Sequence, residues 1–339
     1  ESSIYDDWRN KSSCFVFNFV DSVFVFLSVY RDVYDGFRGF GEYVECPGVY
    51  YVNFKSGFES FVRTAVDRLP KGLLQLGCPV SKVVWKQKNS ANKVVSVELV
   101  EGSVVTCDHL IMTPSVGVLK HFTFEPPLPK YKHEVLSCFG FDAMDKIFLI
   151  WDDGPFWTKD TLGFQLLWPK YDKQFFKEHG EYLRGIYGFE TVTGRPNVLL
   201  AWIGGDDAMQ MEQLSDDEVL RGCYQLLKRF ADKVVPSGVK MPSRIIRSSW
   251  GSDRFIKGAY SHRLLQYDHT PDPVGRLQKP LYTTASTTTD KGEPKLCPLV
   301  LFAGEATDPS HFSTVHGALR SGQREAKRLV NYWKSCGQL

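Results

Sequence analysis

The chain has 339 residues, enough for two domains or one large interleaved domain. Its hydrophobic fraction of 43% and charged fraction of 24% are ordinary for a soluble globular protein, and its net charge of +2 shows no nucleic-acid footprint. The eight cysteines form no C-x-x-C pair, which excludes the usual zinc and redox motifs, and we expect reduced thiols.

Residues 14–30, CFVFNFVDSVFVFLSVY, form an apolar run that contains Asn18 and Asp21. A membrane span needs about 20 apolar residues and tolerates such polar groups poorly. The preceding ESSIYDD lacks the basic start of a signal peptide. We therefore expect a buried helix rather than a membrane span, with a strand as the alternative.

Apolar residues recur at helical spacing in residues 57–69 and predict a helix. Three strands are predicted to follow as a meander, at 79–87, 93–100 and 106–113, because polar turn residues separate them. More strands are predicted beyond the meander, at 145–153, 163–169, 182–190 and 197–205.

Ser215-x-x-Glu218 is a capping box and predicts the start of a helix. The apolar face of this helix consists of Val219, Leu220, Cys223, Leu226, Leu227 and Phe230. The remaining predictions are a strand at 244–250, a loop-rich stretch at 262–296, a strand at 298–304 and a helix from 317 to about 335. Mixed strands and helices with antiparallel meanders indicate an α+β or mixed α/β fold.

The dinucleotide fingerprint G-x-G-x-x-G is absent, as are the P-loop, the G-x-S-x-G elbow and the H-E-x-x-H zinc motif, so no metal site is predicted. Residues 301–318, LFAGEATDPSHFSTVHGA, are more informative. Gly304 permits a sharp turn after a strand, and Glu305 can offer its N–H or its carboxylate to a ligand. The helix start near Val315 brings unpaired N–H groups and a positive dipole end. An anionic or electron-accepting ligand and a helix docked tightly on a sheet explain this pattern equally well.

The segment 301–330, LFAGEATDPSHFSTVHGALRSGQREAKRLV, resembles the C-terminal flavin-binding segment of FAD-dependent amine oxidases, above all spermine oxidase and acetylpolyamine oxidase. Earlier segments also look like family segments, in the family's order: FGEYVECPG with SGFESFV, QLGCPVSKVVW, LIMTPSVGVLK, MDKIFLIWDDGPFW and RSSWGSDRFIKGAYS. The match covers roughly residues 37–335. It implies an FAD/NAD(P)-binding-like domain interleaved with a substrate domain of antiparallel sheet and helices.

The resemblance assigns cofactor contacts to five residues. Val80 matches the position whose backbone meets the adenine of FAD. Gly304 and Glu305 match the turn beside the pyrophosphate and ribityl chain. Thr314 and Val315 match the point where backbone N–H groups face the N1/C2=O edge of the flavin, and a helix start there favours the reduced, negatively charged flavin.

The resemblance also assigns residues near the reacting atoms. Lys146, which alone would be read as a solvated lysine at a strand start, matches the lysine that binds a water near flavin N5. Trp250 and Tyr260 match aromatics near the flavin, and Tyr260 with Thr314 matches the two sides of the substrate cage. Ala259 stands where monoamine oxidases carry the flavin-linking cysteine, which implies non-covalent FAD.

The implied domains are a helical part of the substrate domain at 1–50, an FAD-binding part at 51–120, a substrate-binding domain at 121–243 and a second FAD-binding part at 244–339. The family's opening βαβ unit has no counterpart. We therefore expect a partial chain, namely a fragment, an incomplete gene model or a truncated paralogue.

The function implied is flavin-dependent oxidation of a polyamine, spermine or an N-acetylated polyamine, to an imine that hydrolyses to an amine and an aldehyde, with O2 reduced to H2O2. One alternative is a non-catalytic or truncated paralogue that acts as a binding or regulatory protein. Another is a histone-lysine demethylase-like amine oxidase, although the chain has no room for that group's long helical insertion. We expect no nucleic-acid or membrane partner, and a cytoplasmic location because the chain ends Cys-Gly-Gln-Leu rather than in a peroxisomal Ser-Lys-Leu signal.

Overall fold

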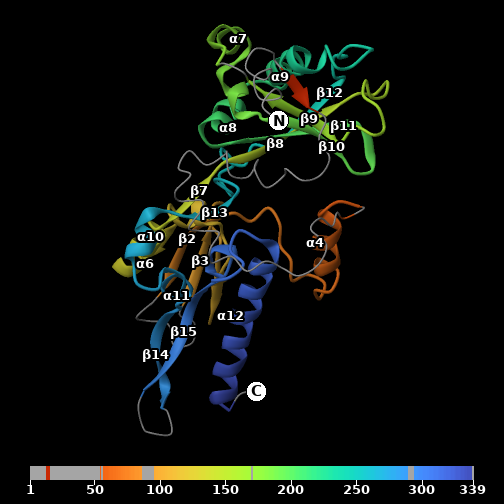
Figure 1. Ribbon diagram of the computed structural model, residues 1–339. Coiled ribbons are helices and arrows are strands. Elements are labelled where there is room, and N and C mark those ends of the chain that lie inside the picture. The colour runs from red at the N-terminus through yellow and green to blue at the C-terminus, as the bar shows by residue number, and fades with distance from the viewer. Residues whose placement is uncertain are drawn as a thin grey trace, which may run out of the picture. The chain divides into compact units, whose positions relative to one another are not determined.

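The computed structural model describes residues 54, 56–85, 95–168, 171–288 and 294–337, with only the backbone for 284–288 and 294–295, and the backbone of strand β1 (Ser13–Phe15). The chain divides into two compact units (Figure 1). Unit 1 consists of Glu1–Val33 and Asp142–Ala259, and unit 2 of Tyr34–Phe141 and Tyr260–Leu339. The units change over at 33/34, 141/142 and 259/260, whereas the domain boundaries expected from the sequence lie at 50/51, 120/121 and 243/244. The functional part that each unit forms stays a prediction.

Unit 1 is built on a six-stranded antiparallel sheet with the order β1-β9-β10-β11-β8-β12. Its other strands are β8 (Met144–Ile150), β9 (Gly163–Leu167), β10 (Gly188–Val192), β11 (Arg195–Gly204) and β12 (Arg244–Arg247). All five overlap predicted strands, but residues 182–185 of the strand predicted at 182–190 belong to the 3-10 helix η2 (Glu181–Gly185).

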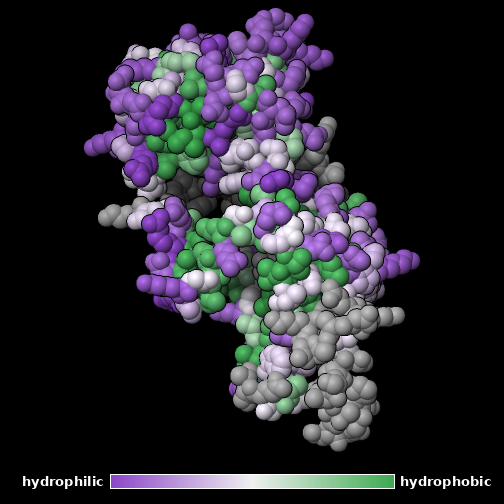
Figure 2. All heavy atoms as spheres, turned by 180° about the vertical axis from the view of Figure 1, so that it is seen from behind, coloured by the Kyte–Doolittle hydropathy of each residue, from purple (hydrophilic) through white to green (hydrophobic). Residues whose placement is uncertain are grey.

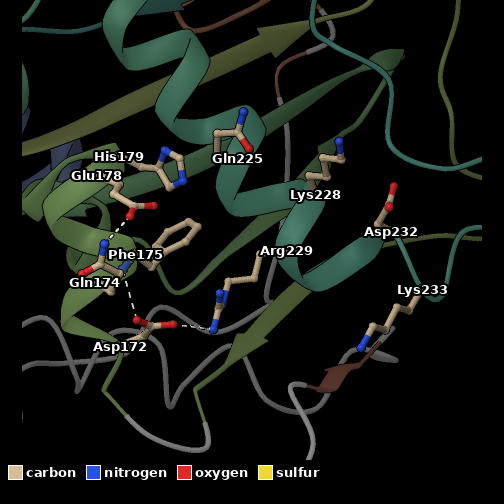
Figure 3. A pocket seen from close by; sticks show the side chains of 10 residues that line it. All are labelled: Asp172, Gln174, Phe175, Glu178, His179, Gln225, Lys228, Arg229, Asp232 and Lys233. Atoms are coloured by element: carbon tan, nitrogen blue, oxygen red, sulfur yellow. Dashed lines mark hydrogen bonds and ion pairs between the residues drawn. The ribbon is translucent and has the colours of Figure 1, made fainter.

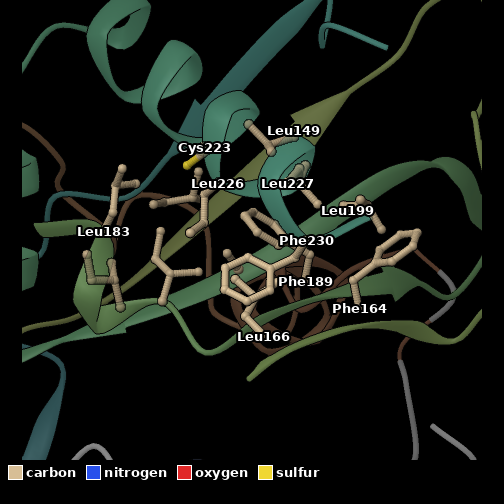
Figure 4. Close-up of a cluster of buried hydrophobic side chains, with 14 of the residues drawn as sticks. Leu149, Phe164, Leu166, Leu183, Phe189, Leu199, Cys223, Leu226, Leu227 and Phe230 are labelled. Atoms are coloured by element: carbon tan, nitrogen blue, oxygen red, sulfur yellow. The ribbon is translucent and has the colours of Figure 1, made fainter. Parts of the chain in front are cut away.

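The helix α9 (Asp216–Ala231) begins at the predicted capping box. Ser215 Oγ accepts a hydrogen bond from Glu218 N at 3.3 Å, and Glu218 Oε2 accepts one from Ser215 N at 2.8 Å, so the prediction is confirmed. The six residues of its predicted apolar face are all buried. Figure 4 shows this face packed against the sheet. Leu226, Leu227 and Phe230 of the helix belong to one buried cluster with Phe164, Phe189 and Leu199 of the strands.

Two shorter helices of unit 1, α7 (Lys173–His179) and α8 (Gly205–Glu212), were not predicted. Asp172 caps α7 by accepting a hydrogen bond from Phe175 N at 3.1 Å. The α8 helix follows β11 directly and starts at Gly205, which has a φ of +60°. Both helices are too short for a hydrophobic period to stand out in the sequence.

Unit 2 contains a four-stranded sheet, β4-β3-β2-β6, a three-stranded sheet, β14-β15-β5, and the pair β13-β7. The bounds are β2 (Val80–Trp85), β3 (Val95–Leu99), β4 (Val104–Cys107), β5 (Leu110–Met112), β6 (Thr123–Glu125), β7 (Phe139–Asp142), β13 (Tyr260–Arg263), β14 (Leu281–Thr288) and β15 (Pro294–Phe302). The predicted meander is therefore wrong in its third strand. The segment 106–113 leaves β4 and enters a different sheet as β5, parallel to β15.

The helices of unit 2 are α4 (Glu59–Val66), α5 (Val116–Leu119), α6 (Lys130–Leu136), α10 (Leu265–His269), α11 (Pro273–Gln278), the 3-10 helix η3 (Glu305–Thr307) and α12 (Val315–Ser335). The long α12, dark blue in Figure 1, confirms the predicted C-terminal helix and packs on η3 and β15. The prediction of a loop-rich stretch at 262–296 is wrong. Asp272 caps α11 and Pro273 occupies its first turn, a start signal that the sequence analysis passed over.

The predicted helix at 57–69 is present as α4, but none of its residues is buried. Its apolar side chains instead contact one another: the Phe58 ring centroid lies 4.9 Å from that of Phe54 and 5.9 Å from that of Phe61. Apolar side chains also reach the surface elsewhere, as the green atoms in Figure 2 show. Isolated exposed apolar residues are normal in globular proteins.

Of the helix predicted at 14–30, only residues 14 and 15 lie within the described part, and they are strand residues that pair with β9. The rest of that segment lies outside the described residues. No helix in the described part of the chain is both long and apolar enough to cross a membrane. The predicted mixed α/β fold class is confirmed by the sheets and helices of both units.

Candidate active site

In unit 2, Gly304 makes the turn that ends β15, with φ +133° and ψ 164°. Only glycine adopts this region without strain. Gly304 N donates to Ser321 Oγ of α12 at 2.8 Å, and Gly304 O accepts hydrogen bonds from Thr307 N at 3.1 Å and Thr307 Oγ1 at 2.8 Å. The turn is therefore tied both to η3 and to the helix that follows.

The carboxylate of Glu305 holds two other segments in place. It accepts hydrogen bonds from Ser261 N at 3.1 Å, Ser261 Oγ at 2.7 Å and Ser313 N at 2.6 Å. Burial raises the pKa of Glu305, and the hydrogen bonds from Ser261 and Ser313 partly offset that rise. Because its carboxylate accepts from both serines, Glu305 positions their chain neighbours, Tyr260 and Thr314. The carboxylate is therefore occupied, and the backbone of Glu305 is the part that remains for a ligand.

The start of α12 leaves backbone donors available. Thr314 Oγ1 caps the helix by accepting a hydrogen bond from Gly317 N at 3.1 Å and donates to His311 O at 2.6 Å. In the described part of the chain, the N–H groups of Thr314 and Val315 donate to no acceptor. They lie at the positive end of a 21-residue helix, an arrangement that suits a negatively charged group.

Val80 opens β2 and is 38% exposed. On one side it pairs with Leu99 of β3, while the parallel pairing with β6 begins only at Lys82. The strand therefore meets β6 only beyond Val80, which leaves this side of its backbone uncovered by the sheet. This is consistent with the predicted contact between a ligand and the Val80 backbone.

In unit 1, Lys146 of β8 lies opposite Trp202 of β11, and its Nζ is 4.5 Å from the Trp202 ring centroid. Trp202 Nε1 in turn donates to Glu190 Oε1 at 2.7 Å. Burial lowers the pKa of Lys146, and the charge of Glu190 offsets part of this shift. The amine is thus held in a half-buried aromatic setting in which it gives up its proton more readily than a solvated lysine.

Trp250 lies in the turn after β12, where its backbone is held at both ends. Trp250 N donates to Asp145 Oδ1 at 3.1 Å, and Trp250 O accepts from Gly258 N at 2.8 Å. Ser248 joins this turn to Lys146, because Lys146 N donates to Ser248 Oγ at 2.9 Å and Ser248 N donates to Lys146 O at 3.0 Å.

The structure thus brings the predicted residues together in two groups. In unit 2, the Glu305 carboxylate binds Ser261 and Ser313, which are next in the chain to Tyr260 and Thr314, and Gly304 and Val315 adjoin the same segments; Val80 lies on another sheet. Lys146 and Trp250 form the second group, in unit 1.

The sequence analysis missed the residues that position these groups: Asp145, Glu212, Ser248, Ser261 and Ser313. The sequence could have indicated that Asp145 is buried. Side chains alternate between the two faces of a strand, so the residue next to Lys146, which alone would be read as solvated, is predicted to point inward.

A pocket of ≈ 480 Å³ between α7 and α9 contains none of the predicted site residues. Within it Arg229 pairs with Asp172 at 2.6 Å and Gln174 donates to Glu178, as Figure 3 shows. Arg229 also stacks 5.1 Å from the Phe175 ring centroid. Within the described ranges, no cluster of His, Cys, Asp and Glu is arranged to hold a metal ion.

Comparison with known proteins identifies related chains. "Polyamine oxidase 1" of Oryza sativa subsp. japonica is 31% identical over 316 residues, which cover 87% of this chain and 59% of that protein. The "Peroxisomal N(1)-acetyl-spermine/spermidine oxidase" of Bos taurus is 31% identical over 315 residues, 87% of this chain and 57% of the relative. "Histone demethylase-like protein A" of Aspergillus fumigatus is 33% identical over 264 residues, 74% of this chain and 22% of that protein.

Among solved structures, a triple mutant of Putrescine Oxidase shares the fold with a TM-score of 0.58 at 18% identity, covering 81% of this chain and 53% of that one. The chain thus spans somewhat more than half the length of the polyamine oxidases that it matches. The family model described as flavin containing amine oxidoreductase matches residues 9–330. With this match over most of its length, the chain belongs to the flavin-containing amine oxidoreductases.

Proposed function

We propose that this protein oxidises a polyamine, spermine or an N-acetylated polyamine, with non-covalently bound FAD and releases H2O2. The observation that carries the proposal is the pair of N–H groups of Thr314 and Val315 at the start of α12, which have no acceptor among the described residues and follow the Gly304–Glu305 turn in the chain. When bound, FAD supplies the acceptor for a hydride from the carbon next to the amine nitrogen.

The residues present fit this cofactor. Thr314 and Val315 would donate to the flavin edge that becomes negative on reduction, and the dipole of α12 adds about 0.3–1 kcal/mol there. The backbone of Gly304 and Glu305 would approach the phosphate and ribityl chain, which the lack of a side chain at Gly304 permits. Val80 would meet the adenine. Ala259 has no thiol that could link to the flavin, so acid precipitation should release FAD into solution.

The chain's own side chains would position the substrate and a water. Lys146 would hold a water next to the reacting carbon, and its lowered pKa makes it fit to accept a proton and return it. Trp250 and Tyr260 would line the flavin and the amine with aromatic surface. The Thr314 hydroxyl is committed to His311 O and Gly317 N, so its methyl group is the part left to face a substrate.

The test uses the full-length purified protein. We expect the absorbance of an oxidised flavin and peroxide production with spermine, N1-acetylspermine or spermidine. Lys146→Met should lower kcat by about 10²-fold or more if the lysine handles a proton in turnover. Arg195→Met, which removes an exposed cation at the start of β11, is the matched control and should keep full activity. A colourless protein that takes up no FAD would instead support a non-catalytic binding or regulatory paralogue.

A histone-lysine demethylase-like activity is the second candidate, because one related chain carries that name at 33% identity. Both reactions oxidise a carbon next to nitrogen, so the same assay separates them when a dimethyl-lysine peptide is added as a substrate. Peroxide with the peptide but not with the polyamines would overturn the first proposal.

We place the protein in the cytoplasm, with the peroxisome named for the bovine relative as the alternative. Cell fractionation tests this location.

A further inference from the structure

Asp145, the neighbour of Lys146 in β8, is a fully buried acid that the proposed reaction does not use. Its Oδ1 accepts hydrogen bonds from Ser248 Oγ at 2.6 Å and Trp250 N at 3.1 Å. Its Oδ2 is also buried, yet no donor of the described residues reaches it. A buried carboxylate oxygen without a donor is costly, so this atom needs a proton or a cation.

Glu212, the last residue of α8, lies next to Asp145 and binds the same turn. Glu212 Oε1 accepts a hydrogen bond from Gly251 N at 2.7 Å, and Oε2 accepts one from Ser252 N at 2.7 Å. Together the two acids bind three consecutive backbone N–H groups, those of residues 250, 251 and 252. The turn is therefore held by carboxyl groups from β8 and α8.

The described residues provide no positive charge for this pair. The Lys146 side chain lies on the opposite face of β8, over Trp202. From β12, Arg247 approaches the end of α8, but its Nη1 donates to Met211 O at 2.6 Å and its Nε pairs with Asp216 at 2.7 Å. No Lys or Arg in the described part forms an ion pair with either acid.

Two neighbouring acids, one buried and one half-buried, do not both ionise easily without a cation nearby. Burial raises the pKa of Asp145 to about 6, and the hydrogen bond with Glu212 adds to the rise. Burial pushes the pKa of Glu212 up as well, but hydrogen bonds from Asp145, Ser252 and Gly251 outweigh it, so the net shift is downward. These opposite directions assign the proton to Asp145 and the charge to Glu212.

We propose that Asp145 and Glu212 share one proton and that this carboxyl pair positions the turn that carries Trp250. The protonated Oδ2 of Asp145 donates to the Glu212 carboxylate, which completes the hydrogen bonding of both acids. The pair also fixes Lys146, because Ser248 Oγ donates to Asp145 and accepts from Lys146 N. Both acids are positioning residues. The effect on turnover rests on the proposed function, whereas the shared proton does not.

The pair predicts an asymmetry between two conservative variants. Asparagine at 145 resembles the protonated acid: its Oδ1 still accepts from Ser248 and Trp250, and its amide group donates to Glu212. Glutamine at 212 is different, because both Glu212 oxygens already accept from backbone N–H groups. An amide there turns an NH2 group toward one of these donors, so Glu212→Gln should be the damaging change although both variants replace one carboxyl group by an amide.

The experiment compares wild type, Asp145→Asn, Glu212→Gln and Asp145→Ala, with Asp153→Asn as an exposed control in the turn after β8. Asp145→Asn should keep kcat/KM within about twofold, whereas Glu212→Gln should lose about tenfold or more because a backbone N–H is left without an acceptor. The infrared spectrum near pH 5.5 should show a protonated carboxylic acid band that Asp145→Asn removes and Asp153→Asn keeps. The band tests the proton even if the protein oxidises no amine.

The pH dependence provides a second readout. The pKa of Asp145 is raised in the folded chain, so its stabilising contribution is present below pH 4 and is lost as pH rises through about 6. Wild type should therefore lose stability relative to Asp145→Asn as pH rises from 4 to 7. The proposal is overturned if Asp145→Asn is as damaging as Asp145→Ala, if Glu212→Gln is the milder variant, or if the acid band survives in Asp145→Asn.

Discussion

Asp145 Oδ1 lies 3.1 Å from the backbone nitrogen of Trp250, although the two residues are 105 positions apart in the sequence. This bond joins the start of β8 to the turn after β12, and β12 itself pairs with β8. Lys146 and Trp250, predicted from the sequence as separate site residues, therefore belong to one hydrogen-bonded part of unit 1. A disturbance of the turn should reach Lys146.

Gly251→Ala should disturb that turn. A Cβ on Gly251 would lie 2.3 Å from Met209 Sδ and 2.9 Å from both Ala143 Cβ and Glu212 Oε1, so the turn must move away from α8. Such overpacking costs about 1–3 kcal/mol, and we expect a loss of this size in the free energy of unfolding measured with urea. Amine oxidation should fall with it.

Gly322→Ala is the matched control for this substitution. Gly322 lies within α12, and a Cβ there would have no neighbour within 4 Å. Alanine should stabilise the helix by about 0.5–1 kcal/mol. Equal destabilisation by the two substitutions would contradict the tight packing of the Trp250 turn.

Thr314→Val should separate the role of the hydroxyl from that of the side-chain shape. The variant keeps the volume of the side chain but removes the acceptor of Gly317 N and the donor to His311 O. Loss of an N-cap costs about 1 kcal/mol, so we expect this loss in the unfolding free energy. The affinity for FAD, measured by flavin fluorescence quenching, should fall because the start of α12 is no longer fixed.

Thr314→Ser is the control, because serine retains the cap. Its unfolding free energy and its affinity for FAD should both stay close to those of wild type. A serine variant that binds FAD as weakly as the valine variant would show that the methyl group, not the cap, supports the cofactor.

Ser215→Ala should weaken α9, whose apolar face fills the core of unit 1. The serine accepts a hydrogen bond from Glu218 N at 3.3 Å, and its removal leaves that N–H without its cap. We expect a loss of about 0.5–2 kcal/mol in urea unfolding. Ser215→Asp retains a capping acceptor and should lose less; an equal loss would contradict the cap.

Local signals in the sequence predicted α9 and α12 well. The capping box at Ser215 and the small residues after Val315 act within a few positions, so they can be read without knowing the rest of the fold. The prediction of a third meander strand at 106–113 was wrong for the opposite reason. Whether Leu110 continues the meander or joins β15 depends on a partner 190 residues away, Val300, which no local pattern reveals.

The residues of the candidate site also fall into those that local sequence signals reveal and those that they do not. Gly304 and Thr314 are recognisable because a turn and a helix start have local signatures. The contacts between Glu305 and Ser261 or between Asp145 and Glu212 depend on register and packing over 44 and 67 positions, so they appear only in three dimensions. The resemblance to a family supplied roles for the first kind of residue and none for the second.

Lys132 of α6 leads to a prediction about pH, because its side chain is fully buried in unit 2. Its Nζ donates to Leu277 O at 2.5 Å and Lys279 O at 2.6 Å, and lies 3.9 Å from the Phe302 ring centroid. Burial lowers the pKa of Lys132 to about 6, with Glu325 opposing the shift and Lys279 adding to it. We therefore expect the lysine to be largely neutral in the folded chain near neutral pH.

Between pH 6 and 10 the unfolded chain then holds a proton at Lys132 that the folded chain has released. Stability should rise with pH in this window, by at most about 1.4 kcal/mol per pH unit from this group. Lys132→Met should remove that slope and, because it leaves the carbonyls of Leu277 and Lys279 without their donor, should also lower stability at pH 8. Urea unfolding at pH 6, 7, 8 and 9 measures both effects.

Lys130→Met, on the exposed side of the same helix, is the control and should leave the slope unchanged. Parallel curves for wild type and Lys132→Met would mean that the amine stays charged when folded, held by the Phe302 ring and Glu325.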